Sequence, residues 1–129
     1  MTDLLDVLVL ARCGNRDLDA DVMETLGYCV RRCALTTRAL AWRYKASSGH
    51  WCALPRLTHD MTDALRWWPP GCSLSLDVNG SGRLAAAKIR NEFHGNCGFE
   101  SSCDQMATPE LAIAWCIVAA SRAGFRRRD

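Results

Sequence analysis

The chain has 129 residues, of which 16 are Lys or Arg and 14 are Asp or Glu, so its formal net charge is +2 at pH 7. This length suits a single domain, residues 1–129, with one hydrophobic core. So small a net charge argues against a nucleic-acid-binding surface, because such surfaces concentrate Lys and Arg. The longest basic run, Arg126–Arg128, lies in the segment 124–129, which we expect to be a solvated and frayed end.

The first apolar stretch, residues 4–11, could be mistaken for a secretory signal. Asp3 and Asp6 stand where a signal would be basic, and no small-residue cleavage site follows. We therefore expect an amphipathic helix that is retained, in a protein of the cytoplasm. In that compartment the eight cysteines are expected to be mostly reduced thiols.

Two further helices are predicted before the middle of the chain. Asp17 is the expected N-cap of the first, which carries apolar residues at helical spacing and ends before Gly27. Thr58 is the expected N-cap of the second, which Pro69–Gly71 terminates. Both helices are short, so we expect packing against other elements to stabilise them.

The segment Thr108–Ala123 predicts the helix on which the domain is packed. Thr108 can cap it, Pro109 occupies a first-turn position that needs no N–H, and Glu110 complements the helix dipole. Every residue from Leu111 to Ala120 is apolar, so this helix must be covered on more than one side. Ten apolar residues are too few to cross a bilayer, which needs about 20.

Two hairpins are predicted between the helices. Residues 40–44 and 50–54 form the first around a turn at 46–49, within a segment, 28–54, that we interpret as a variable excursion. Residues 72–78 and 83–89 form the second around Asn79–Gly82, and residues 91–105 are expected to be a loop. The inward residues of the returning strand are either Leu84, Ala86 and Lys88 or Ala85, Ala87 and Ile89.

These elements predict an α+β fold, in which a small antiparallel sheet and several helices pack in layers as an α/β/α-type sandwich. The C-terminal helix is expected at its centre.

Two groups of residues are candidate metal ligands. The first group combines a pair of cysteines at helical spacing with a neighbouring His and Cys, and consists of Cys29, Cys33, His50 and Cys52. Four such soft ligands suit a tetrahedral structural zinc. The second group, His94, Cys97 and Cys103, offers three ligands. Neither group contains the CxxC spacing of a zinc knuckle, so the alternative is that these cysteines pack as small apolar residues.

Two other motifs resemble functional sites, but a structural role explains each of them better. Residues 77–84 reproduce the first eight positions of an EF-hand loop, but position 12 is Lys88 where calcium needs a bidentate Glu, so a hairpin turn is expected instead. His59 and Asp60 are adjacent at a helix start, where the aspartate suits a capping turn. No Ser or Cys lies in a recognisable nucleophile motif, so we expect no enzymatic activity.

Trp67 and Trp68 are candidate contacts for a protein partner. Adjacent residues on a helix point in different directions, so one ring can be buried while the other stays near the surface. Trp is enriched at interface hot spots, and the rigid diproline follows directly. The alternative is that both rings cover an edge of the sheet.

Several short motifs follow one another in a fixed order along most of the chain. They are Leu4–Leu5, Gly14–Ala20, Leu26–Gly27, Pro55, Thr58, Asp63–Leu65, Trp67–Gly71, Ala107–Ala112 and Trp115–Ile117. Together they resemble the phage ABA sandwich domain family of small phage and prophage proteins. The departures are Leu57, where the family tends to carry an aromatic residue, and residues 59–64. The resemblance implies a layered sandwich and a phage or prophage origin, and it implies no catalytic residues.

The expected function is that of a non-enzymatic protein which binds a host or phage protein in the cytoplasm of an infected or lysogenic bacterium. An anti-defence factor of the anti-CRISPR kind, or a host-takeover factor, is its most concrete form. Two alternatives stay open, a zinc-stabilised nucleic-acid accessory module and a virion or lysogeny accessory protein with a self-association surface. Apart from that first alternative, neither nucleic acid nor a membrane is an expected partner.

Overall fold

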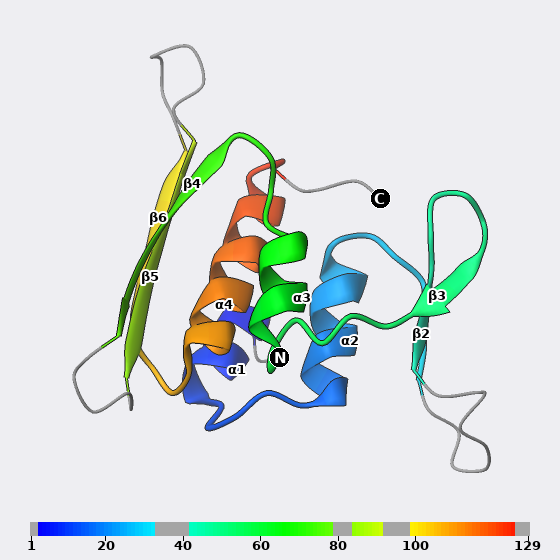
Figure 1. Ribbon diagram of the computed structural model, residues 1–129, viewed down its shortest axis with the longest axis horizontal. Helices are drawn as coiled ribbons and strands as arrows, with labels where there is room; N and C mark the ends of the chain where they lie inside the picture. Colours follow the sequence, from blue (N-terminus) through cyan, green and yellow to red (C-terminus); the bar gives the residue numbers. More distant parts are fainter. Residues whose placement is uncertain (1–2, 33–41, 79–83, 92–98, 126–129) are drawn as a thin grey trace.

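The computed structural model describes residues 3–32, 42–78, 84–91 and 99–125 (Figure 1). The elements within them are α1 (Leu4–Leu10), α2 (Arg16–Thr25), β1 (Val30–Arg31), β2 (Arg43–Lys45), β3 (Trp51–Ala53), α3 (Met61–Arg66), β4 (Cys72–Val78), β5 (Ala85–Asn91), β6 (Glu100–Met106) and α4 (Pro109–Arg122). The described strands form two antiparallel sheets, ordered β1-β2-β3 and β4-β5-β6. The predicted α+β class is confirmed.

The helices lie between the two sheets (Figure 1). Helix α4 packs on β5 and β6 and also contacts α1, α2 and α3, so the C-terminal helix is central, as predicted. The sequence of layers is therefore sheet, helices, sheet, whereas the expected α/β/α arrangement would place a sheet between helices. The small second sheet, which contacts α2 through β1, accounts for this difference.

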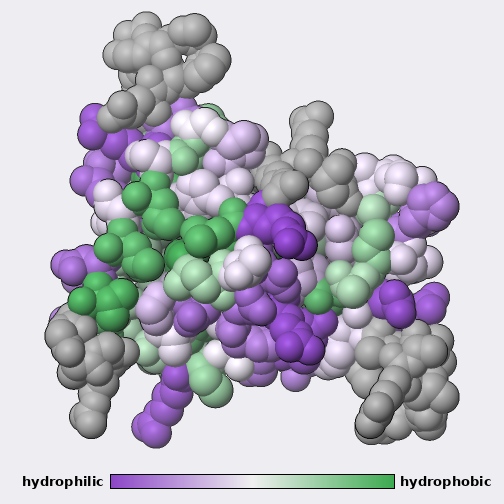
Figure 2. Space-filling model, viewed as in Figure 1, coloured by the Kyte–Doolittle hydropathy of each residue, from purple (hydrophilic) through white to green (hydrophobic). Residues whose placement is uncertain are grey.

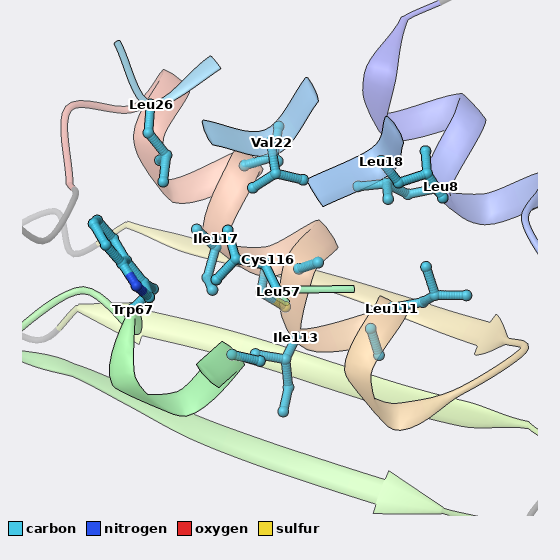
Figure 3. Close-up of a cluster of buried hydrophobic side chains, with 14 of the residues drawn as sticks. Leu8, Leu18, Val22, Leu26, Leu57, Trp67, Leu111, Ile113, Cys116 and Ile117 are labelled. Carbon is cyan, nitrogen blue, oxygen red and sulfur yellow. The ribbon is translucent and has the colours of Figure 1, made fainter. Parts of the chain in front are cut away.

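Helix α4 begins as its sequence predicts. The N–H of Leu111 donates to the Thr108 hydroxyl at 3.1 Å, and Pro109 occupies the first turn. Residues 111–114 and 116–120 are all buried. Leu8, Val22 and Leu57 belong to the same core cluster, which Figure 3 shows around this helix. Each large aliphatic side chain buried there contributes about 1.5–3 kcal/mol to folding.

The caps of α2 and α3 differ from the predicted ones. Asn15 caps α2, because its side-chain oxygen accepts the N–H of Leu18 at 2.8 Å, so the prediction of Asp17 was wrong. Asp60 caps α3, which begins three residues after the predicted Thr58. Thr58 is not free to cap, because its backbone and side chain bond to the buried segment around α2.

The β4–β5 hairpin forms in a regular register that pairs Ser75 with Lys88. Ala85, Ala87 and Ile89 are the inward residues, which decides between the two predicted alternatives. The predicted turn at residues 79–82 lies outside the described residues. The expected loop at 91–105 is wrong where the structure describes it, because Asn91 belongs to β5 and residues 100–106 form β6, which pairs with β5.

The predicted hairpin at the first sheet is confirmed over its described part, since β2 pairs with β3 and Tyr44 faces Cys52. Strand β1, which the sequence did not predict, is the third strand of this sheet and pairs with β2, where Val30 faces Tyr44. The rings of Tyr28, Tyr44 and Trp67 meet edge to face, with centroids 5.4–5.6 Å apart. These three rings, the aromatic trio, pack the small sheet against the end of α3.

Candidate functional site

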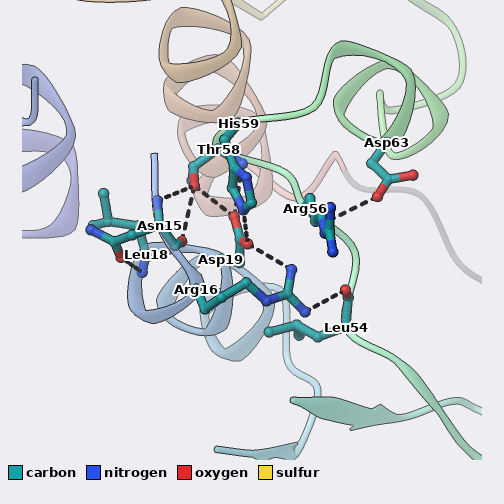
Figure 4. Close-up of polar contacts among 9 residues, drawn as sticks. All are labelled: Asn15, Arg16, Leu18, Asp19, Leu54, Arg56, Thr58, His59 and Asp63. Atoms are coloured by element: carbon teal, nitrogen blue, oxygen red, sulfur yellow. Dashed lines mark hydrogen bonds and ion pairs between the residues drawn. The ribbon is translucent and has the colours of Figure 1, made fainter. Parts of the chain in front are cut away.

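A buried carboxylate, Asp19, is the most elaborate polar centre in the described structure (Figure 4). Its side chain is 0% exposed. One oxygen accepts the backbone N–H of Thr58 at 2.9 Å and the Thr58 hydroxyl at 2.6 Å. The other accepts from Arg16 Nη1 at 2.9 Å and lies 2.8 Å from His59 Nε2. The carboxylate is therefore surrounded by donors, which satisfies a charge that would be costly to bury alone.

The same cluster holds the segment before α3 against the start of α2. Arg16 Nη2 donates to the carbonyl of Leu54 at 2.7 Å, and the N–H of Asn15 donates to the Thr58 hydroxyl at 3.1 Å. Gly14 approaches this segment so closely that a Cβ atom at position 14 would lie 1.9 Å from the Thr58 carbonyl oxygen. The cluster is thus a junction between two segments far apart in the sequence.

The Asp19–His59 contact resembles the carboxylate–imidazole pair that orients a catalytic base, but the rest of such a site is missing from the described residues. No hydroxyl or thiol described here hydrogen-bonds the His59 ring. The hydroxyl of Thr58, which belongs to the cluster, bonds to the carboxylate itself. The arrangement favours a structural role, since a nucleophile would have to contact the imidazole.

The three described members of the first candidate metal group are not brought together. Cys52 pairs with Tyr44 in the small sheet, whereas the carbonyl of Cys29 accepts the N–H of Lys45, the next residue along β2. Neighbouring residues of a strand point to opposite faces, so Cys29 and Cys52 lie on opposite faces of this sheet. His50 is exposed just before β3, and Cys33 lies outside the described residues.

Within the part of the chain that the structure describes, no three His, Cys, Asp or Glu side chains form a group able to hold a metal ion. Of the second candidate group, His94 and Cys97 lie outside the described residues, and Cys103 is in β6. The Cys103 thiol donates to the carbonyl of Ala112 in α4 at 3.6 Å. A hydrogen bond with the Cys116 thiol lowers the pKa of Cys103, and the same bond together with burial raises the pKa of Cys116.

The two adjacent tryptophans have different positions, as the sequence predicted. Trp67 is buried in the aromatic trio, so its ring is not offered to a partner. Trp68 is half-buried, and its Nε1 donates to the carbonyl of Cys72 at 2.9 Å. Trp68 therefore connects the end of α3 to the start of β4. Beside Trp67 lies a hollow of about 300 Å³, lined by Tyr44, Ala53, Leu54, Pro55, Asp63, Arg66 and Trp67.

The exposed apolar side chains include a group around strand β4. Leu76 and Val78 of β4 are 38% and 40% exposed, and Leu65 of α3 and Leu84 before β5 are also exposed. Figure 2 shows hydrophobic residues gathered over the β4 and β5 part of the sheet, beside the helices. Helix α4 covers β5 and β6, and strand β4 lies at the edge of the sheet beyond that cover. We call strand β4, with its exposed Leu76 and Val78, the β4 surface.

No known protein family, no curated protein and no solved structure matches this chain. Its resemblance to the phage ABA sandwich domain family stays a prediction. None of the helices described here has the length and apolar content that a bilayer span requires.

Sequence reasoning missed Asp19 and the edge position of β4. A signal for Asp19 was present, because Asp19, Val22 and Met23 share one helical face, where a carboxylate among apolar residues must find partners. No comparable signal marks β4 as an edge strand, because the order of strands depends on pairing between distant segments.

Proposed function

We propose that this chain is a non-enzymatic binding protein that engages another protein through the β4 surface. The observation that carries the proposal is the combination of an edge strand with half-exposed apolar side chains, Leu76 and Val78, along it. An edge strand offers backbone hydrogen bonds to a partner strand, and its side chains add apolar contacts. Solvent-exposed apolar groups of this kind are characteristic of interaction sites.

The hydrogen bonds of the Asp19 cluster support a binding role for the protein over a catalytic one. Its carboxylate accepts or faces donors from Thr58, Arg16 and His59, all of them within the protein. A site built to act on a substrate needs groups directed toward that substrate. The internal bonds of this cluster instead join α2 to the segment before α3.

We further propose that the protein is of phage or prophage origin and acts in the cytoplasm as an anti-defence or host-takeover factor. The support is the sequence resemblance carried by caps, helix ends and core residues such as Thr108 and Pro109. A binding protein of this size interferes by occupying a surface of a larger host assembly.

The test compares capture by the wild-type chain with capture by two variants in bacterial extract. Leu76→Lys places a charge on the β4 surface, and Val9→Lys is the matched control at an exposed apolar position of α1. We expect the wild-type chain and Val9→Lys to retain the same protein, and Leu76→Lys to lose it. Equal retention by all three folded proteins would refute the β4 surface as the binding site.

The anti-defence role has its own test. Cells with an active defence system are infected with a phage that the system restricts, with and without expression of this chain. We expect expression to raise the plating efficiency, and Leu76→Lys to abolish the rise. An unchanged plating efficiency across the major classes of defence system would exclude this role and would leave the binding proposal to the capture experiment.

A further inference from the structure

The outer edge of β4 presents the backbone groups of Leu74 and Leu76. The carbonyl of Cys72 accepts a hydrogen bond from Trp68 Nε1. Asn91, which pairs with Cys72, donates its N–H at 2.8 Å to the residue that precedes β6, on the other side of β5. Cys72 and Asn91 are thus a non-hydrogen-bonded pair, and by alternation the N–H and C=O groups of Leu74 and Leu76 face away from β5.

These outward groups have no partner among the described residues, because β4 pairs with β5 alone there. A strand added at this edge would find its hydrogen bonds at Leu74 and Leu76. It would also cover the exposed side chains of Leu76 and Val78. The occupant of the edge must therefore supply an extended strand with apolar residues on the same face.

Strand β4 itself meets these requirements, because its sequence is self-complementary about Ser75. In an antiparallel pair of copies centred there, the facing residues are Ser75 with Ser75, Leu74 with Leu76, Cys72 with Val78, and Ser73 with Asp77. In this register Leu74 and Leu76 exchange N–H···O bonds. The backbone groups of Cys72 stay bonded within the chain, to Trp68 and Pro69. Apolar side chains meet on the face that carries the helices, and small polar ones meet on the other face.

The charges and the regularity of β4 favour this pairing. Natural edge strands are protected by Lys, Pro or a bulge, and β4 has none of these among its seven residues. Its one charge, Asp77, faces Ser73 of the other copy, so no like charges meet. The opposite edge differs, because β6 has a register shift beside Ala85–Ala87 and a positive φ of 55° at Gln105.

We infer that the partner at the β4 surface is a second copy of this chain, paired through β4 about a two-fold axis at Ser75. This inference rests on the proposed binding role of that surface and names its partner. The two copies share one continuous antiparallel sheet of six strands. Because the axis is perpendicular to the sheet, the helices of both copies lie on the same side, and Leu76 of each copy contacts Leu74 of the other.

The test measures the sedimentation of the full chain at concentrations up to about 1 mM, the weak end of specific association. We expect the wild-type chain to pass from monomer to dimer. Ser75 is exposed, so Ser75→Lys and Ser75→Glu are compatible with the fold, and each sets like charges against each other across the axis. Each variant alone is expected to weaken association more than about tenfold, and an equal mixture is expected to restore it.

Amide hydrogen exchange supplies a second readout on the same protein. In the monomer the N–H of Ser75 is paired within the sheet, whereas those of Leu74 and Leu76 face outward. The dimer is therefore expected to slow exchange at Leu74 and Leu76 as the concentration rises, and to leave Ser75 unchanged. Far-UV circular dichroism of both charged variants checks that they are folded. Ser75→Glu faces Lys88 of β5 favourably, whereas Ser75→Lys faces it with a like charge.

The outcomes separate this inference from the proposed function. If the wild-type chain stays monomeric while Leu76→Lys loses a captured protein, the inference that the partner is a second copy is refuted. The proposed binding role of the β4 surface is then kept. Association that persists in both charged variants, or that mixing does not restore, overturns the register about Ser75. A chain that neither associates nor loses any captured protein refutes both proposals.

Discussion

The hydroxyl of Thr58 lies 2.6 Å from the carboxylate of Asp19, across 39 residues of sequence. The contact joins the start of α2 to the segment that leads into α3. Because the carboxylate is 0% exposed, its hydrogen bonds are not replaced by water when a partner is removed. The junction is therefore a place where single substitutions have large effects on stability.

The substitution Asp19→Ala is expected to lower the free energy of unfolding by about 3–5 kcal/mol, because it leaves Arg16 and the backbone of Thr58 without their acceptor. Asp19→Asn, which keeps one oxygen acceptor, should lose less. Urea denaturation measures both. Asp17→Ala is the control, since Asp17 is an exposed residue of the same helix. Equal losses for Asp17→Ala and Asp19→Ala would contradict the structural role of the junction.

The close approach of Gly14 to Thr58 gives a second test. A Cβ atom at position 14 would lie 1.9 Å from a backbone oxygen, so the Gly14→Ala variant must displace the segment before α3. We expect a loss of about 1–3 kcal/mol, the usual range for overpacking. Gly49→Ala is the comparison, because no atom lies within 4 Å of its Cβ and its cost comes only from a φ of +91°. Thermal denaturation in which Gly14→Ala matches the wild type would argue against this contact.

The ion pair between Asp3 and Arg122 gives a prediction for pH dependence. A hydrogen bond from Arg122 lowers the pKa of Asp3 from 3.8 to about 2. Since the folded pKa is below the ordinary value, the pair stabilises the fold above pH 3.8 and loses that contribution as the pH falls toward 2. The effect on stability is small because both side chains are solvent-accessible.

An NMR titration of the Asp3 carboxyl carbon tests this directly. We expect a midpoint near pH 2 in the wild-type chain and a return toward 3.8 in Arg122→Gln. Glu100 is an internal reference, because Lys88 lowers its pKa and Arg122 does not contact it. A midpoint for Asp3 that Arg122→Gln does not change would show that the pair is not formed in solution.

The cysteines are expected to react at different rates with iodoacetamide. Cys13 and Cys29 are exposed, whereas Cys116 is buried and its raised pKa disfavours the reactive thiolate. Peptide mapping after brief labelling at pH 8 should therefore find the label on Cys13 and Cys29. Labelling in denaturant is the control that should add Cys116. Rapid labelling of Cys116 in the native protein would indicate that α4 is not packed as described.

The features that sequence reasoning predicted well are those with local causes. The start of α4 depends on Thr108 and Pro109, and its burial follows from an unbroken apolar run. Alternation predicts that every second residue of β5 points inward, but it does not say which of the two sets does so. The structure shows that the set containing Ile89 is buried. Such features are encoded within a few residues, so they can be recognised without knowledge of the rest of the chain.

The features that were missed depend on distant partners. Strand β6 reads as a loop because Ser101, Ser102 and Asp104 have little intrinsic preference for strands, and it forms through pairing with β5. Thr58 is a residue type that commonly caps helices, but its hydroxyl donates a hydrogen bond to Asp19 instead. Asp60 is the N-cap of α3. The positions of Cys29 and Cys52 also depend on pairing between strands, because alternation places them on opposite faces of the small sheet.

The central position of α4 also bears on how the protein is made. The surfaces of β5, β6 and α1 that pack on this helix are complete in sequence before residue 109 is translated, yet they lack this packing partner until the helix has been made. A nascent chain that ends before Thr108 therefore exposes the apolar faces that α4 covers in the folded protein. Folding of this domain is therefore expected to be completed only after translation of α4, and the exposed apolar faces make the shorter nascent chain prone to aggregation.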